Sequence, residues 1–314
     1  MGAHHTDEAF GDSYELPNER AYCETCAAVA SVMLSWRLLL ATGKVRYADL
    51  IERTLHNGLL VGISCSGDRY TYVNPLQVRD DHPACGGGIE PARTPWFRCA
   101  CCPPNVMRLL ASLQHYVVPG NETVLVVHQC LSGDFTSRTS VGTVGVSVES
   151  ALPWSGSVKV TVTQSTREPW VLVLRVPQWT ERFHLSLEGM VLDETPQEGW
   201  LRITRRWRIG DSLNFEPEMP PRLTRPDSRV DAARGCVAIE RGPLIYYLEQ
   251  VDQDGFRLDD ISLDVDAPRH RVRPARSARR HRPTPRRRAS PPTTTYYAWG
   301  NRQTGAMRVW SPRA

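Results

Sequence analysis

Two periodicities of apolar residues divide the chain near residue 116. Before that point apolar side chains recur every three to four positions, which indicates helices, and after it they alternate, which indicates β-strands. Because the helical part precedes the β part and does not alternate with it, we expect separate α and β domains and not an α/β fold. The expected domains cover residues 1–116, 117–222 and 223–314.

Three helices are predicted in the first part. The first covers residues 25–42 and ends before Gly43; because it is apolar on most sides, we expect it to be buried. The second begins near Tyr47 and ends near Asn57-Gly58, so that the two form an αα-hairpin. The third has Pro103 and Pro104 in its first turn, where a missing N–H costs nothing.

The second part consists of short β-type runs separated by glycine, proline or polar turns, which is typical of antiparallel sandwiches. Strands are expected at 124–129, 141–148, 158–164, 171–176, 183–187, 200–204 and 212–215. Residues 235–248 add more strand-like sequence, and 307–310 form a last short strand, within a final strand region at 296–310.

The composition, 41% hydrophobic and 23% charged, is that of a soluble globular protein. No run approaches the roughly 18 apolar residues of a membrane span, and the first 20 residues lack the apolar centre of a signal peptide. We therefore expect a cytoplasmic protein with no membrane partner.

The net charge of +4 comes from one segment. Between Arg269 and Arg288 there are ten arginines and no acidic residue. Such a run can bind nucleic acid, but its Arg/Pro-rich composition, almost without apolar residues, favours disorder. Residues 267–294 are therefore interpreted as a disordered insert or an out-of-frame stretch, and nucleic-acid binding as the weaker alternative.

Five of the nine cysteines lie in two short clusters, at 23–26 and 99–102. Glu24 and Cys26 can converge from an extended segment that leads into a helix, and with Cys101 and Cys102 they complete a Glu-Cys-Cys-Cys set suited to tetrahedral zinc. The alternative is that these are buried structural thiols. The odd count and the clustering favour a metal or catalytic site over a disulfide framework.

A thiol beside zinc at a helix N-terminus is deprotonated at neutral pH and is therefore nucleophilic. Either Cys101 or Cys102 meets this description. A covalent mechanism also requires an acid/base group, and Glu8 is one candidate among many, since on its own it would be an ordinary solvated carboxylate.

Several long motifs are more informative about fold and function than the spacing of the cysteines. Together they closely resemble glycoside hydrolase family 127, the β-L-arabinofuranosidases, and they occur in the order found in that family. These motifs are Glu8-Ala9-Phe10-Gly11, Tyr14-Glu15-Leu16-Pro17-Asn18, Ala21-Tyr22-Cys23-Glu24-Thr25-Cys26-Ala27, Tyr72-Val73-Asn74-Pro75-Leu76, Cys101-Cys102-Pro103-Pro104-Asn105 and Tyr296-Tyr297-Ala298-Trp299-Gly300-Asn301-Arg302.

The resemblance implies a multidomain α and β fold: helices of a partial (α/α)6 barrel, followed by two antiparallel β-sandwich, jelly-roll-like domains. It implies Zn2+ held by the residues that match Glu24, Cys26, Cys101 and Cys102. It further implies retaining hydrolysis with Cys101 as nucleophile and Glu8 as general acid/base. Glu52 and Tyr72 match positions that line the sugar pocket, although an exposed helix position remains an equal alternative for Glu52.

The family's barrel begins upstream of the segment that matches Glu8. A partial barrel is expected to expose an apolar flank that includes Val29, Leu39 and Leu55, and hence to depend on another chain or to form an oligomer. The predicted function is a β-L-arabinofuranosidase acting on an arabinofuranose-containing glycan, impaired by truncation. The alternative is a catalytically silent remnant that binds zinc and carbohydrate.

Overall fold

The computed structural model describes residues 8–80, 93–96, 99–117, 120–121, 124–253, 257–266, 293–303 and 305–314. The chain divides into two compact units, each made of separate stretches of sequence. Unit 1 is formed from Met1–Ser31, Arg53–Met107 and Pro221–Ala314, and unit 2 from Val32–Glu52 and Arg108–Pro220. The predicted insert lies outside the described residues except for its last two positions.

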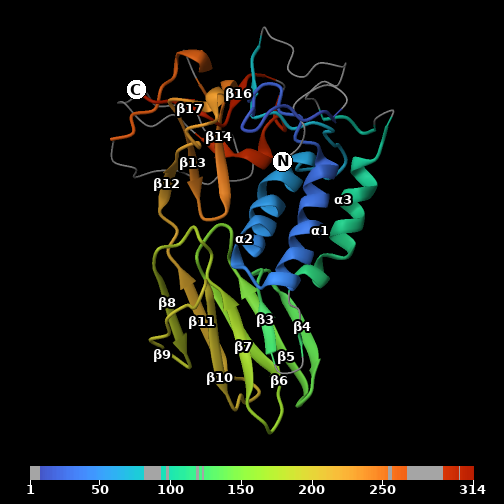
Figure 1. Cartoon of the computed structure of the whole chain (residues 1–314), viewed down its shortest axis with the longest axis vertical. Helices are drawn as coiled ribbons and strands as arrows, with labels where there is room; N and C mark the ends of the chain where they lie inside the picture. The colour runs from blue at the N-terminus through green and yellow to red at the C-terminus, as the bar shows by residue number, and fades with distance from the viewer. Residues whose placement is uncertain are drawn as a thin grey trace. The chain divides into compact units, whose positions relative to one another are not determined.

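The three predicted helices are present: α1 (Thr25–Thr42), α2 (Val45–Arg53) and α3 (Cys102–Ala111) (Figure 1). Helix α1 stops as expected, because Gly43 adopts a positive φ of 66° and its N–H bonds to Leu39 O at 2.8 Å. Helix α2 is shorter than predicted and continues as a π-helical segment, Thr54–Leu59. Short 3-10 turns occur at Leu60–Gly62, Leu113–Tyr116, Asp231–Ala233, Gln250–Asp252, Leu258–Asp260 and Tyr296–Ala298.

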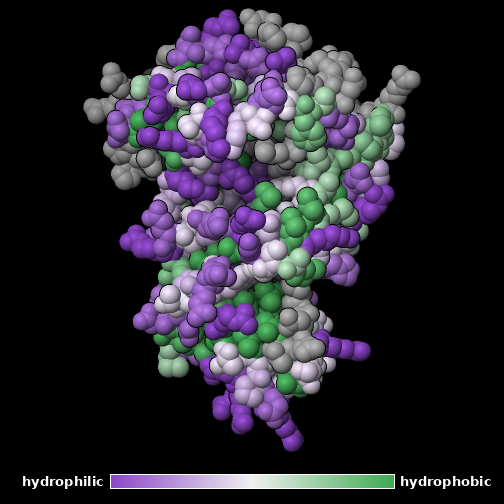
Figure 2. All heavy atoms as spheres, in the orientation of Figure 1, coloured by the Kyte–Doolittle hydropathy of each residue, from purple (hydrophilic) through white to green (hydrophobic). Residues whose placement is uncertain are grey.

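The prediction of which residues form an exposed apolar flank is wrong. Val29, Leu39 and Leu55 are all buried. Helix α1 instead exposes Leu34 and Leu40, each 60% accessible, so it is also not buried on most sides. Figure 2 shows hydrophobic side chains at the surface in the region of helices α1 and α3. A helix that is apolar all round gives no sequence signal for which side faces the core.

Helix α1 also departs from the expectation about membranes. Its 18 residues have a mean hydropathy of 1.5, long and apolar enough by composition to cross a bilayer, and 33% of that window is buried. It is the one such helix in the described part of the chain. Core helices of soluble proteins meet the same criteria, so this feature alone assigns no location.

Unit 2 contains two sheets that share one core. The four-stranded sheet has the order β10-β7-β3-β2, and the six-stranded sheet the order β4-β5-β6-β11-β8-β9. The strands are β2 (Gly120–Asn121), β3 (Val124–Val127), β4 (Gly133–Thr139), β5 (Gly142–Ser150), β6 (Val158–Gln164), β7 (Trp170–Arg175), β8 (Phe183–Leu187), β9 (Met190–Val191), β10 (Trp200–Arg205) and β11 (Ser212–Pro217). Inward-facing residues of both sheets, such as Leu172 and Phe215, pack in a single apolar cluster.

Most strand pairs in unit 2 are antiparallel, as predicted, with one exception. Strands β3 and β7 run parallel, with Val126 opposite Val173. The antiparallel prediction is wrong for this pair because three strands of the other sheet lie between them in the sequence, so that no tight turn sets their direction.

Unit 1 contains a seven-stranded sheet with the order β1-β16-β14-β13-β12, in which β15 pairs with β14 and β17 with β13. Its strands are β1 (Gln77–Val78), β12 (Pro221–Thr224), β13 (Cys236–Arg241), β14 (Leu244–Glu249), β15 (Thr294–Thr295), β16 (Met307–Arg308) and β17 (Ser311–Pro312). The expected final strand over 296–310 is wrong in its first part, which is a 3-10 turn. Strand β1 pairs with β16, so the segment between the two cysteine clusters takes part in the C-terminal sheet.

Candidate active site

The second thiol cluster lies at the beginning of helix α3. Cys102 is the first helical residue and is buried, and Pro103 and Pro104 occupy the first turn as predicted. Cys101 directly precedes the helix and is half-buried. Its carbonyl accepts the Asn105 N–H at 3.2 Å. Both sulfur atoms are therefore carried by the positive end of a helix, where thiolates are stabilised.

The first cluster lies at the beginning of helix α1, which is fixed by buried hydrogen bonds. The Thr25 hydroxyl donates to Thr71 O at 2.8 Å, and the Asn74 amide donates to Thr25 Oγ1 at 3.0 Å and to Cys23 O at 2.9 Å. Gly62 leaves room for Thr25, since a Cβ there would lie 2.5 Å from its side-chain atoms. These contacts hold the residues on either side of Thr25 in place.

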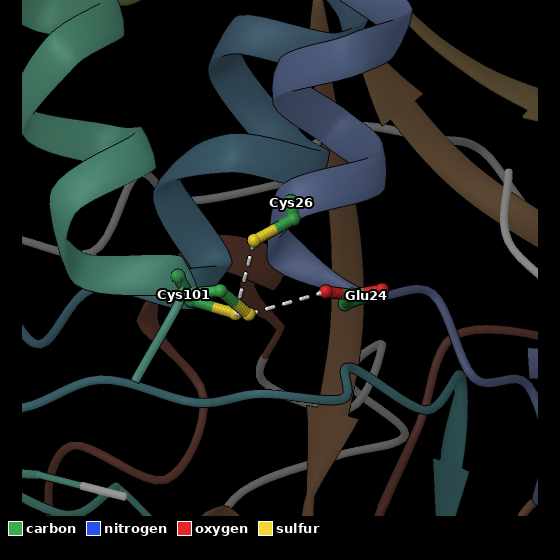
Figure 3. A group of neighbouring side chains, drawn as sticks. Glu24, Cys26 and Cys101 are labelled. Atoms are coloured by element: carbon green, nitrogen blue, oxygen red, sulfur yellow. Dashed lines mark hydrogen bonds between the residues drawn. The ribbon is translucent and has the colours of Figure 1, made fainter. Parts of the chain in front are cut away.

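The structure brings the four predicted ligands together. One ligand atom each from Glu24, Cys26, Cys101 and Cys102 lies within 4.8 Å of the others. Cys26 Sγ is 3.5 Å from Cys102 Sγ, Cys101 Sγ is 3.9 Å from Cys102 Sγ, and Cys101 Sγ is 3.6 Å from Glu24 Oε1 (Figure 3). Tetrahedral zinc with Zn–S bonds of about 2.3 Å separates its sulfur ligands by about 3.8 Å. The donor set and its spacing fit a tetrahedral metal ion.

The surroundings of these thiols also suit a metal. Burial raises the pKa of Cys26 to about 12, and burial with the neighbouring sulfur of Cys26 raises the pKa of Cys102 further. Both thiols therefore keep their protons at neutral pH unless a cation replaces them. The Asn105 amide donates to Cys26 Sγ at 3.1 Å, a contact that orients one ligand from outside the set.

Glu8 and Cys101 are connected through Tyr72. The Tyr72 hydroxyl donates to Glu8 Oε1 at 3.3 Å. Burial raises the pKa of Tyr72, and its hydrogen bond with the Cys101 sulfur raises it further. The ring of Tyr22 packs edge-on against Tyr72, with centroids 6.0 Å apart. The predicted acid/base group and the predicted nucleophile thus share one phenol as neighbour.

Glu52 has a different environment. It belongs to unit 2, and the alternative of an exposed helix position is wrong, because the residue is 4% exposed. One carboxylate oxygen accepts a hydrogen bond from Arg175 at 2.5 Å and the other from Trp179 Nε1 at 2.7 Å. Both oxygens of Glu52 are therefore engaged inside unit 2.

Three further residues of the site belong to the sequence motifs but were not predicted to have a role: Tyr22, Asn74 and Asn105. Each lies within four residues of a predicted site residue in the sequence. The signal that could have identified them was a polar or aromatic side chain next to a ligand, one helical turn away from it or in the same short motif.

Comparisons with known proteins identify the family of the chain. Family models match residues 1–115 (β-L-arabinofuranosidase, GH127 catalytic domain), 125–219 (GH127 middle domain) and 221–312 (glycoside hydrolase family 127 C-terminal domain). These ranges compare with the expected domains at 1–116, 117–222 and 223–314.

A non-reducing end β-L-arabinofuranosidase of Bifidobacterium longum subsp. longum is 34% identical over 100% of this chain and 52% of its own length. The crystal structure of a GH127 β-L-arabinofuranosidase from Geobacillus stearothermophilus T6 matches with a TM-score of 0.86 and 32% identity, over 100% of this chain and 53% of that one. A further GH127 β-arabinofuranosidase structure matches with a TM-score of 0.82 and 30% identity, over 100% of this chain and 53% of that one. The chain spans about half the length of these relatives. It belongs to glycoside hydrolase family 127.

Proposed function

We propose that the chain carries the reacting groups of a retaining glycoside hydrolase that acts on β-L-arabinofuranosides. One observation carries the proposal: a thiol of a four-ligand cluster, Cys101, and a carboxylate, Glu8, share the phenol of Tyr72. The names of the matched relatives support the sugar, and an arabinofuranose-containing glycan is the proposed substrate.

The proposed metal is Zn2+, held by Glu24, Cys26, Cys101 and Cys102. When bound, it supplies the positive charge that keeps the cluster's sulfur atoms deprotonated at neutral pH. The support is the donor set, three thiols and one carboxylate, and the separations of 3.5 to 3.9 Å between their ligand atoms.

In the proposed reaction the Cys101 sulfur attacks the anomeric carbon and the bond to the leaving oxygen breaks. Glu8 donates its proton to that oxygen as the aglycone leaves. Glu8 then removes a proton from water, whose oxygen displaces the Cys101 sulfur from the same carbon. Two inversions give net retention, with a thiolate in place of the usual second carboxylate.

Tyr72 is proposed to contact the sugar, since its hydroxyl lies between the two reacting groups. The assignment of Glu52 as a substrate contact stays a prediction. Both of its carboxylate oxygens already accept hydrogen bonds within unit 2. The cytoplasmic location, the absence of a membrane or nucleic-acid partner, and an oligomeric state stay predictions as well.

The test is hydrolysis of 4-nitrophenyl β-L-arabinofuranoside by the zinc-loaded chain. Cys101→Ser and Glu8→Gln should each lower the rate by about 10²- to 10⁴-fold. The matched controls Cys65→Ser and Glu194→Gln, at exposed positions, should not. Mass spectrometry of the acid-quenched enzyme should find a pentosyl adduct on Cys101. A folded, zinc-bound chain that binds the sugar without turnover would instead be the silent binding remnant.

A further inference from the structure

A cavity lies entirely within unit 2. It has a volume of about 670 Å³, between the C-terminal end of helix α1 and the outer face of strands β3, β7 and β10. That volume is in the range of small-molecule sites. We propose that this cavity binds one sugar unit of the glycan, as a saccharide site separate from the four-ligand cluster. The choice of sugar rests on the proposed function, whereas the site itself is inferred from the residues that line the cavity.

The floor of the cavity is set by strand register. Val126, Val173 and Arg202 lie side by side across three strands, because Val126 pairs with Val173 and Val173 with Arg202. Leu39 and Leu40, near the end of α1, add apolar wall. The cavity is therefore apolar on two sides, as the carbon face of a sugar ring requires.

The rim is a rigid two-residue hairpin turn. Gln197 and Trp200 exchange two backbone hydrogen bonds of 2.9 Å, and the residues between them, Glu198 and Gly199, both adopt positive φ angles of 50° and 84°. A Cβ at Gly199 would lie 2.8 Å from Val45 Cγ1, so only glycine fits. The turn thus fixes where the Gln197, Glu198 and Trp200 side chains meet the cavity.

Trp200 is itself held in place. Its indole Nε1 donates to Gly43 O at 3.0 Å, the carbonyl that follows the end of helix α1. The side chain remains partly accessible and lines the cavity. A fixed, partly exposed indole with apolar walls beside it offers a flat surface on which a sugar ring can stack.

His128 forms part of the cavity wall, but its side chain is fully buried behind it. The residue lines the cavity, its ring stacks on Trp36 with centroids 5.0 Å apart, and neither ring nitrogen has a hydrogen-bond partner in the described structure. Burial lowers the pKa of His128 to about 3, so the ring is neutral and offers one donor and one acceptor. Because the imidazole is buried, it shapes the wall and is not counted among the polar groups that a ligand contacts.

The polar groups around the cavity favour a neutral ligand. Glu198 and Arg202 carry opposite charges, and Gln197 offers donor and acceptor atoms; all three are exposed. An anion or a cation would meet a like charge on one side. A compound with several hydroxyl groups and an apolar face suits both these exposed polar groups and the apolar walls, and saccharides have that chemistry.

The site is tested by nuclear magnetic resonance on the full chain carrying Cys101→Ala, which prevents turnover. The indole N–H signal of Trp200, identified by its loss in Trp200→Phe, is followed while methyl β-L-arabinofuranoside is added. The signal should shift and saturate in the millimolar range. Gln197→Ala and Arg202→Ala should each weaken binding about three- to tenfold, as expected for one lost hydrogen bond.

Matched controls are Gln164→Ala and Arg206→Ala, at exposed positions of the same unit that do not line the cavity. They should leave the titration unchanged. A Trp200 signal that does not respond, or that responds equally in the Arg202 and Arg206 variants, overturns the proposal. If hydrolysis occurs but Trp200 does not respond, this site alone fails. If Trp200 responds without hydrolysis, only the proposed function fails.

Discussion

Arg175 and Glu52 form an ion pair in the interior of unit 2, with 2.5 Å between Arg175 Nη2 and Glu52 Oε1 and side-chain exposures of 0% and 5%. Arg175 Nη1 also contacts Asp49 Oδ1 at 2.5 Å, and its Nε donates to His128 O at 2.6 Å. Burial alone would lower the pKa of Arg175, but the two carboxylates raise it. The guanidinium therefore stays charged and links the end of strand β7 to helix α2.

Arg175→Met should destabilise the protein by about 3–5 kcal/mol, because it leaves two buried carboxylates without their cation. Urea unfolding followed by circular dichroism measures the change. Arg182→Met is the matched control, since Arg182 and Glu218 pair at the surface with exposures of 79% and 51%, and should change stability little. Equal effects of the two variants would contradict the assigned role of Arg175.

His128 should make unit 2 sensitive to mild acid. Because its folded pKa is lowered to about 3 from an ordinary 6.5, the unfolded chain binds a proton between these values and the folded chain does not. Its contribution to stability is complete above pH 6.5 and decreases as the pH falls, by up to about 1.4 kcal/mol per pH unit. Urea unfolding of wild type and His128→Phe between about pH 7 and 5 should show a shallower decrease in the variant. His184→Gln, at an exposed position, should follow wild type.

Gly62→Ala should displace the beginning of helix α1. The new Cβ would lie 2.5 Å from Thr25 Oγ1 and Cγ2, and Thr25 is buried and hydrogen-bonded to Thr71 O. Overpacking of this kind costs about 1–3 kcal/mol, and zinc affinity should fall with it because Glu24 and Cys26 flank Thr25. Gly305→Ala, which meets no atom within 4 Å, is the control. Unchanged stability and zinc affinity in Gly62→Ala would show that Thr25 does not fix the ligands.

Asn105→Ala should weaken zinc binding about 10- to 100-fold, because it removes the amide that donates to Cys26 Sγ at 3.1 Å. Competition with a chromogenic zinc chelator measures the affinity. Asn214→Ala, on strand β11 in unit 2, is the matched control. If the two variants bind zinc equally well, the contact of Asn105 with Cys26 has no part in metal binding.

Tyr72→Phe should lower kcat more than it raises KM, because the lost hydroxyl contacts both proposed reacting groups, Cys101 and Glu8, and donates to Glu8. Steady-state kinetics with the arabinofuranoside substrate measure both constants. Tyr70→Phe, whose hydroxyl has a 3.4 Å contact to Gly67 O within its own loop, provides the control. A pure rise in KM would make Tyr72 a binding residue only.

The sequence predicted the elements that local chemistry determines. Gly43 ends helix α1, and two prolines open helix α3, because φ preference and missing N–H groups act within a few residues. The four-ligand set was predicted because thiols are scarce and cluster, with Glu24 beside one of the clusters, and the motif resemblance implied the same four residues. The connection of Glu8 with Cys101 was not predictable in this way, because it runs through Tyr72, which lies far from both in the sequence.

Features set by distant partners were not predictable in the same way. Strand β4 was missed because its residues alternate between half-buried and exposed with little apolar content. The burial of Glu52 depends on Arg175, 123 residues later in the chain. The helical pattern around Glu52 alone favours solvent, so a local reading cannot distinguish a surface acid from one paired in the interior.

The contact between Cys26 and Cys102 has a consequence for oxidation. Their sulfur atoms lie 3.5 Å apart, although the residues are 76 positions apart in the sequence, and a disulfide bond needs about 2.05 Å. The two sulfur atoms need to approach each other by only about 1.5 Å. A peroxide could then oxidise the two thiols to a disulfide, and the peroxide would be reduced to water or an alcohol. That bond would remove two of the four proposed ligands at once, so a metal ion held by them would also protect these thiols from oxidation.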